Sequence, residues 1–272
     1  MRYAFDVQYI GKNYDGSQIQ FEGKSDENPQ GIQIGRTIQG ELENALSTLI
    51  LSGRKSKNNK DETLAKYNNR PVKAIFSGRT DKGVNSLGQV VHFDTDEMIV
   101  ASKFLYSINE ILPDDISVTN LREVDGRFHA QKSAKKRHYR FEFINRRIKN
   151  AFDGDLLRVK YPTDIERMQK SLNYLLGEHD FSSFKSSGTL NPSKICIIYE
   201  AKVSRVGDRV IIDIVGNRFL YNMVRTIVGT LLEIEGHNLQ PEHMKDVLEA
   251  KDRQKAGRTV SPYGLTLVKV MY

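Results

Sequence analysis

Apolar and polar residues alternate with a period of two in several short runs, which is the pattern of β-strands with one buried face. The first run covers residues 2–9, where Tyr3, Phe5, Val7 and Tyr9 share one face. Further strands are expected over residues 72–78, 88–94, 116–124, 138–144, 194–206, 209–215 and 264–272. The runs 194–206 and 209–215 are separated by two residues and predict a hairpin.

Between these strands, apolar residues three or four positions apart predict helices. In the segment 38–50, Leu42, Ala45 and Leu49 have this spacing, and the preceding Thr37 is a suitable N-cap. The segment 102–112 is expected to end as a helix before Pro113. The remaining helices are expected over residues 165–179, 219–234 and 241–250.

The predicted elements follow the order β-α-β-β-α-β twice along the chain. This order predicts an α+β protein made of two ferredoxin-like domains with antiparallel sheets. We expect the N-terminal domain at residues 1–127 and the C-terminal domain at residues 128–272. Two polar stretches, 21–35 and 52–71, are rich in Gly, Asn, Ser, Lys and Asp, and they are expected to be surface insertions.

The composition adds a basic charge to this picture. The 272 residues carry 41 Lys and Arg against 34 Asp and Glu, a net charge of +7, which favours a polyanionic partner. The single cysteine, Cys196, excludes an internal disulfide and lies in an apolar run typical of a buried, inert thiol. The alternating N-terminus does not resemble a signal peptide, and no apolar run approaches the length of a membrane span. A cytoplasmic protein without membrane association is expected.

The loop inside FSGRTDKGVNSLGQVVHF, residues 76–93, has two interpretations. Asp81-Lys82-Gly83 is a good turn sequence, with Gly83 suited to positive φ, so a hairpin turn with a solvated aspartate is one of them. In the other, the loop glycines expose Asp81 at a cleft as nucleophile or base, and Arg79 keeps its carboxylate ionised. The loop alone leaves both open.

Other familiar chemistries find no support in the residues. The six histidines form no pair four residues apart with a nearby carboxylate, so a metal site is not expected. Neither a P-loop nor a GxGxxG turn opens a helix, and no serine stands in GxSxG. The residues therefore predict no metal site, no nucleotide-binding turn and no serine nucleophile.

The strand KKRHYRFEF places cations and aromatic residues on alternate faces. One face carries Lys135, Arg137, Tyr139 and Phe141, and the opposite face carries Lys136, His138 and Arg140. Such a surface suits RNA, because cations contact phosphates and aromatic rings stack on bases. An edge strand that uses lysines to prevent pairing with another sheet is the alternative.

The segment 219–234 is apolar over most of its circumference and is expected to be a largely buried helix. Arg218, Asn222 and Arg225 would lie on one stripe of that helix. A guanidinium there needs an anion, which is either a structural carboxylate or, as a sharper hypothesis, Asp81.

Taken together, these residues resemble the TruA family of tRNA pseudouridine synthases over nearly the whole chain. The family loop GRTDxGVHxxGQVxHF matches residues 78–93. Further matches are INEILPDDI, FHA, the tyrosine of KRHYRF, HDFSSF, RFLYNMVRTIVGTLLEIEG and the closing AGRTVSPYGLTLVKVMY.

The resemblance implies an isomerase with the pseudouridine synthase fold that acts on tRNA without a cofactor. Asp81 would add covalently to the target nucleotide, at uracil C6 or ribose C1′, and Tyr139 would stack on the target base. Arg79 would occupy the place of the flipped nucleotide, and Arg225 would pair with Asp81 and keep its pKa low. The family modifies uridines 38 to 40 of the anticodon stem-loop and works as a homodimer with basic grooves for tRNA. On this basis Lys135, Lys136, Arg137 and Arg140 are the candidate RNA-binding residues.

Departures from the family pattern leave alternatives open. Ile10 replaces an aspartate, Ser17 a tryptophan, Lys82 an alanine and Asn85 a histidine. A synthase acting at other tRNA or RNA positions is one alternative. A non-catalytic RNA-binding protein is another, although the RRM signature is absent. A metabolic enzyme of ferredoxin-like fold is the third, without a pocket motif to support it.

Overall fold

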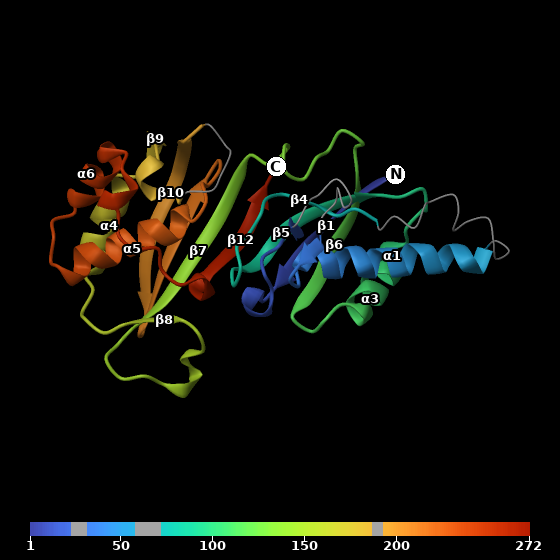
Figure 1. Ribbon diagram of the computed structural model, residues 1–272, viewed down its shortest axis with the longest axis horizontal. Coiled ribbons are helices and arrows are strands. Elements are labelled where there is room, and N and C mark those ends of the chain that lie inside the picture. The colour runs from blue at the N-terminus through green and yellow to red at the C-terminus, as the bar shows by residue number, and fades with distance from the viewer. Residues whose placement is uncertain (23–31, 58–71, 187–192) are drawn as a thin grey trace. The chain divides into compact units, whose positions relative to one another are not determined.

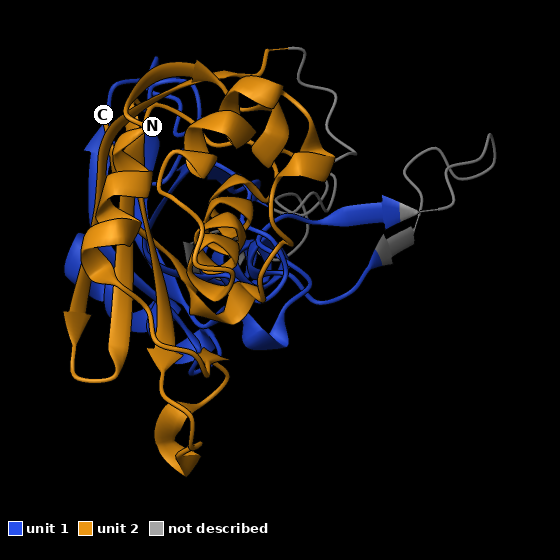
Figure 2. Ribbon diagram, turned by 90° about the vertical axis from the view of Figure 1, so that its left-hand side faces the viewer, with its two compact units in different colours: residues 1–134 blue, residues 135–272 orange. Residues whose placement is uncertain are grey.

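The computed structural model describes residues 1–22, 32–57, 72–186 and 193–272. The chain forms two compact units, residues 1–134 and residues 135–272 (Figure 2). Each unit is described by itself below.

The sheet of the first unit has β1 (Arg2–Tyr9) at its centre. It pairs antiparallel with β5 (Asn85–Asp94) on one side and with β6 (Ile116–Val124) on the other. The short β4 (Ile75–Phe76) pairs with β5. The expected strands are therefore present, and β5 begins three residues earlier than predicted, inside the loop that carries Asp81.

Two helices, α1 (Ile38–Lys57) and α3 (Ala101–Ile111), pack against one face of this sheet (Figure 1). The hydroxyl of Thr37 accepts a hydrogen bond from the Gly40 N–H at 3.2 Å, which confirms the predicted N-cap of α1. The core between the helices and the sheet contains alternate residues of β1 together with apolar residues of the helices. It includes Phe5, Val7, Leu42, Leu46, Phe93 and Ile108.

The structure describes only the ends of the two polar stretches. The ends of the first stretch pair as a short hairpin, β2 (Gln20–Glu22) and β3 (Ile32–Ile34). The second was expected to begin at residue 52, but α1 continues to Lys57. Residues 23–31 and 58–71 of these stretches lie outside the described residues.

The sheet of the second unit is built around β7 (Lys136–Asn145). One side of β7 pairs with β12 (Leu265–Met271) and the other with β11 (Arg209–Gly216), both antiparallel. The sheet continues through β10 (Ile195–Val206) to β9 (Gly177–Asp180), and β8 (Leu157–Val159) runs parallel to the end of β7. The predicted β10–β11 hairpin is confirmed.

The helices α4 (Ile165–Asn173), α5 (Met223–Gly236) and α6 (His243–Ala250) lie on one face of this sheet (Figure 1). Two helix predictions need correction. The helix from Ile165 ends at Asn173, and residues 177–180 form β9, because Gly177 adopts a φ of +96° that breaks the helix. The helix expected from residue 219 begins at Met223, because Asn222 has a left-handed backbone with φ +61°.

Both units thus carry the order β-α-β-β-α-β, with β2–β3, β8, β9 and α6 added to it. The predicted α+β class with mainly antiparallel sheets is confirmed. Across the described parts of the chain, no helix has the length and apolar composition needed to cross a membrane.

Candidate active site

The loop that carries Asp81 leaves the sheet at Ser77 and returns to it at Asn85. The Ser77 N–H donates to the Val90 carbonyl at 2.8 Å, and the Ser77 hydroxyl donates to the side chain of Gln89. The Gln89 amide nitrogen then donates to the Gly78 carbonyl at 2.8 Å. Gln89 is fully buried, so it holds the first peptide of the loop from inside the protein.

The middle of the loop alternates between buried and accessible residues. Thr80 is only 3% exposed, whereas Asp81 beside it is half-buried. The Val84 N–H donates to the Asp81 carbonyl at 3.1 Å, and Gly83 adopts a φ of +82°. The turn predicted from Asp-Lys-Gly is therefore present. The half-buried Asp81 is part of this turn, so the turn does not exclude the catalytic interpretation, which stays a prediction.

Thr80 is bound by residues of the N-terminal strand and the segment after it. Its hydroxyl shares a 2.7 Å hydrogen bond with the Tyr9 hydroxyl. Burial raises the pKa of Tyr9 to about 12, so Tyr9 is a neutral phenol throughout the physiological pH range. Both the N–H and the carbonyl of Thr80 bind Ser17, and the Thr80 N–H donates to the Ser17 hydroxyl at 2.8 Å.

Two departures from the family pattern have structural partners in this unit. The Lys82 ammonium lies 2.7 Å from Asp15 Oδ1 and, through this hydrogen bond, lowers the pKa of Asp15. Asn85 accepts a hydrogen bond from the Gly11 N–H at 2.9 Å. Sequence reasoning missed both pairs because the partners lie about 70 residues apart in the chain.

Arg79 stands two residues before Asp81 in the loop, and its side chain is exposed. Its expected support of the Asp81 carboxylate stays a prediction.

The basic strand β7 is not an edge strand, because it pairs with β11 and β12 on its two sides. The alternative of lysines that protect a sheet edge is therefore wrong. On one face, His138 Nε2 lies 2.6 Å from Asp213 Oδ1, and Arg140 Nε lies 2.9 Å from the same oxygen. On this face too, the Lys136 ammonium lies 4.4 Å from the centre of the Tyr199 ring, within cation–π range.

The other face of β7 carries Arg137 and Tyr139. The Arg137 guanidinium donates to the Asn217 carbonyl at 2.8 Å, and burial lowers the pKa of Arg137. The Tyr139 ring packs edge-on against Phe219, with ring centres 5.0 Å apart. Lys135 precedes the strand and is exposed. The candidate RNA-binding residues therefore do not share one surface: Lys136 and Arg140 lie on the face opposite Arg137.

Arg225 lies in the first turns of α5. The predicted stripe with Arg218 and Asn222 is wrong, because those two residues precede the helix. Asn222 instead orients Arg225 from the N-cap position, with the Arg225 Nη1 donating to Asn222 Oδ1 at 2.7 Å. Arg225 Nε donates to the Val260 carbonyl at 2.8 Å, which fixes the guanidinium further.

The structure thus places Arg79 and Asp81 together in the first unit. Tyr139, Arg225 and the four basic residues at positions 135, 136, 137 and 140 belong to the second unit. Within the second unit, Tyr139 and Arg225 are anchored by separate partners, Phe219 for the first and Asn222 for the second.

Comparisons with known proteins decide the family. A family model described as tRNA pseudouridine synthase matches residues 172–272. A tRNA pseudouridine synthase A from Thermoanaerobacter sp. (strain X514) is 36% identical over 98% of this chain and 97% of its own length. The protein of that name from Bacillus subtilis (strain 168) is 37% identical, covering 100% of this chain and 99% of its own length.

The chain belongs to the tRNA pseudouridine synthase A family. This TruA family is a family of isomerases. A further member, from Anoxybacillus flavithermus, is 39% identical over 98% of this chain and 96% of its own length. A chain in the crystal structure of a Cbf5-Nop10-Gar1 complex gives a TM-score of 0.31 at 10% identity, covering 85% of this chain and 53% of that one; a likeness at this level carries no argument.

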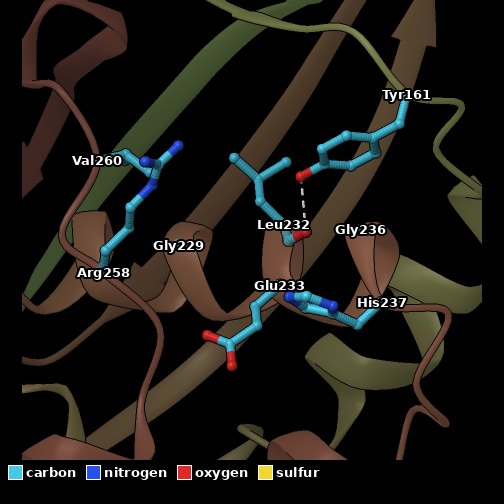
Figure 3. Close-up of a pocket in the computed structure, with 8 residues that line it drawn as sticks. All are labelled: Tyr161, Gly229, Leu232, Glu233, Gly236, His237, Arg258 and Val260. Atoms are coloured by element: carbon cyan, nitrogen blue, oxygen red, sulfur yellow. Dashed lines mark hydrogen bonds between the residues drawn. The ribbon is translucent and has the colours of Figure 1, made fainter.

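A pocket in the second unit of this TruA-family chain was not expected from the sequence (Figure 3). It has a volume of about 380 Å³ and lies beside the C-terminal half of α5. The Tyr161 hydroxyl donates to the Leu232 carbonyl at 2.7 Å at its rim, and the side chains of Glu233, His237 and Arg258 line it. None of the predicted site residues lines this pocket.

In the described parts of this TruA-family chain, no group of three or more His, Cys, Asp and Glu side chains is placed to hold a metal ion. Cys196 is fully buried, and burial raises the pKa of its thiol to about 11. The thiol is therefore inert, as the apolar run around it predicted.

Proposed function

We propose that the chain is a tRNA pseudouridine synthase that isomerises uridine in the anticodon stem-loop, at positions 38 to 40. The family supports the reaction class. The observation that supports the catalytic residue most directly is the loop geometry: a half-buried Asp81 is displayed beside a fully anchored Thr80. A reactive carboxylate needs both accessibility and a fixed position, and this arrangement supplies both.

In the proposed reaction, the Asp81 carboxylate adds to the target nucleotide at uracil C6 or ribose C1′. The bond between N1 and C1′ breaks, the uracil turns, and a bond forms between C5 and C1′. The C5 proton leaves, N1 gains a proton, and the aspartate is released. The product is an isomer of the substrate, so the balance requires no redox, metal or group-transfer cofactor.

We assign the supporting roles by the family resemblance. Arg79 occupies the place of the flipped nucleotide, and its exposed side chain is compatible with that role. Tyr139 stacks on the uracil, and Arg225 is the cationic partner of the catalytic aspartate. The first unit carries the aspartate loop, and the second unit completes the RNA-binding cleft.

Among the candidate RNA-binding residues, Lys135 is the one most suited to phosphate contact. It is exposed, whereas Arg140 already pairs with Asp213. Replacing Lys135 with Ala should weaken tRNA binding and reduce the slope of log K against log salt by about 1. We further propose that the enzyme acts in the cytoplasm as a homodimer, and sedimentation of the purified protein at micromolar concentration tests the dimer.

The proposed target is tested with tRNA transcripts labelled with tritium at uridine C5. Wild-type protein should release tritium from transcripts with uridine at positions 38 to 40. Release should be lost when those positions are changed to cytidine and the rest of the tRNA is kept. Release that persists in the changed transcripts would show that the target uridine lies at another position. Binding of tRNA without any release would indicate a non-catalytic RNA-binding protein.

A further inference from the structure

Ser17 lies against the loop that carries Asp81 and is fully buried. Its N–H donates to the Thr80 carbonyl at 3.0 Å, and its hydroxyl accepts a hydrogen bond from the Thr80 N–H at 2.8 Å. The Ser17 hydroxyl also lies 3.4 Å from the Thr80 carbonyl oxygen. One small residue therefore binds both backbone polar groups of the residue before Asp81.

These contacts act on the peptide unit to which Asp81 belongs. The Thr80 carbonyl is part of the peptide bond whose nitrogen is that of Asp81. When this oxygen and the Thr80 N–H are held in place, the backbone at Asp81 is held as well. The direction of the Asp81 side chain is therefore restricted. Tyr9 binds the Thr80 side chain, whereas Ser17 binds the Thr80 backbone next to Asp81.

The backbone before Ser17 allows this close approach. Gly16 adopts a φ of +106°, and a Cβ at this position would lie 3.0 Å from the Thr80 carbonyl oxygen. A residue with a side chain would be strained there and would crowd the loop. Gly16 thus permits Ser17 to reach Thr80.

A second contact to the loop is weaker. The Lys82 and Asp15 side chains are 70% and 40% exposed, so water and salt screen their ion pair, and such pairs contribute little. The Ser17 contacts are buried, where an unsatisfied N–H is costly to leave behind. Ser17 therefore dominates the attachment of the loop to residues 15–17.

We propose that Ser17 is a positioning residue that sets the orientation of Asp81 for the isomerisation. The inference rests on the proposed function, because it assigns catalysis to Asp81. Serine departs here from the family pattern, which usually has tryptophan at this position. An indole has an N–H donor and no acceptor, so a tryptophan side chain cannot accept a hydrogen bond from the Thr80 N–H.

The test compares three variants with the wild-type protein. Ser17→Ala removes the acceptor, and Ser17→Cys keeps a weak acceptor of similar size. Ser171→Ala is the control, because Ser171 is also fully buried and its hydroxyl donates only to the Arg167 carbonyl of its own helix. Two quantities are measured on each protein: amide hydrogen exchange over residues 79–84, and the single-turnover rate of tritium release at saturating tRNA.

Ser17→Ala should increase the exchange rate of the Thr80 amide about tenfold or more, because that N–H loses its partner. It should lower the single-turnover rate about 10- to 100-fold while tRNA Kd stays within threefold, since orientation affects chemistry rather than binding. The exchange rate and the single-turnover rate of Ser17→Cys should both lie between those of Ser17→Ala and wild type. Ser171→Ala should match wild type in both measurements.

Three results would overturn the proposal in distinguishable ways. Unchanged exchange in Ser17→Ala would mean that Ser17 does not hold the loop. Faster exchange with an unchanged single-turnover rate would mean that the Ser17 hydrogen bonds fix the loop but do not position Asp81. A wild-type protein that binds tRNA and releases no tritium would refute the proposed function itself, and the positioning role with it.

Discussion

His92 offers a sharp test of the packing in the first unit through the pH dependence of stability. The side chain is 3% exposed, and its Nδ1 accepts a hydrogen bond from the Ala130 N–H at 3.2 Å. Burial, assisted by the nearby Arg2 and His129, lowers the pKa of His92 from 6.5 to about 4. Protonation would place a second donor against the Ala130 N–H, which agrees with the direction of the shift.

The sign and size of the effect follow from proton linkage. Between pH 4 and 6.5 the unfolded chain binds a proton at His92 and the folded protein does not, so acid favours unfolding. The loss in free energy of unfolding between pH 7.5 and pH 5 is about 2 kcal/mol from this residue alone, at about 1.4 kcal/mol per pH unit. At pH 7.5 both states are neutral at His92, so the contribution is close to zero there.

The assay is urea denaturation of wild type and His92→Gln at pH 7.5 and at pH 5. The variant is expected to be less stable than wild type at pH 7.5, because the Ala130 N–H loses its original acceptor. Its further loss of stability on going to pH 5 should be smaller than that of wild type by about 2 kcal/mol. Equal losses in the two proteins would refute the assignment of a neutral, buried His92.

Three further predictions concern other parts of the chain. Arg167→Met should lower the free energy of unfolding by about 3–5 kcal/mol in urea denaturation, because it leaves the fully buried Glu235 carboxylate without its two-point partner; a loss below 1 kcal/mol would contradict this. Asn109→Ala should cost about 2–3 kcal/mol in the same assay, since Asn109 bonds both backbone groups of Val118, and a neutral result would show that these bonds are not made in solution. Cys196 should react with a thiol reagent only after denaturation, and rapid labelling of the native protein would contradict its burial.

The element order could be predicted from the sequence because it depends on local periodicity. The strand at residues 2–9 and the strand at residues 116–124 match the structure residue for residue. The errors occurred where a backbone conformation interrupted an apolar pattern. Asn222 and Gly177 each adopt positive φ and end or delay a helix that the apolar spacing alone would continue.

The contacts of the candidate site were less accessible to sequence reasoning. The loop itself could be found, because its glycines, charges and flanking strands lie together in sequence. The residues that hold it could not, since Tyr9, Ser17 and Asp15 reach it only through pairing distant in the chain. A buried serine beside a glycine has no sequence pattern that distinguishes it from an ordinary turn.

The central claim is that Asp81 performs the isomerisation, and Asp81→Asn tests it most directly. The substitution removes the nucleophilic carboxylate and keeps its size, in a loop whose anchors at Thr80 are unchanged. The measurement is single-turnover tritium release from C5-labelled tRNA, with tRNA Kd determined in parallel. The account predicts that release is abolished while Kd stays within a few-fold of wild type. Release by Asp81→Asn at a rate near that of wild type would contradict it.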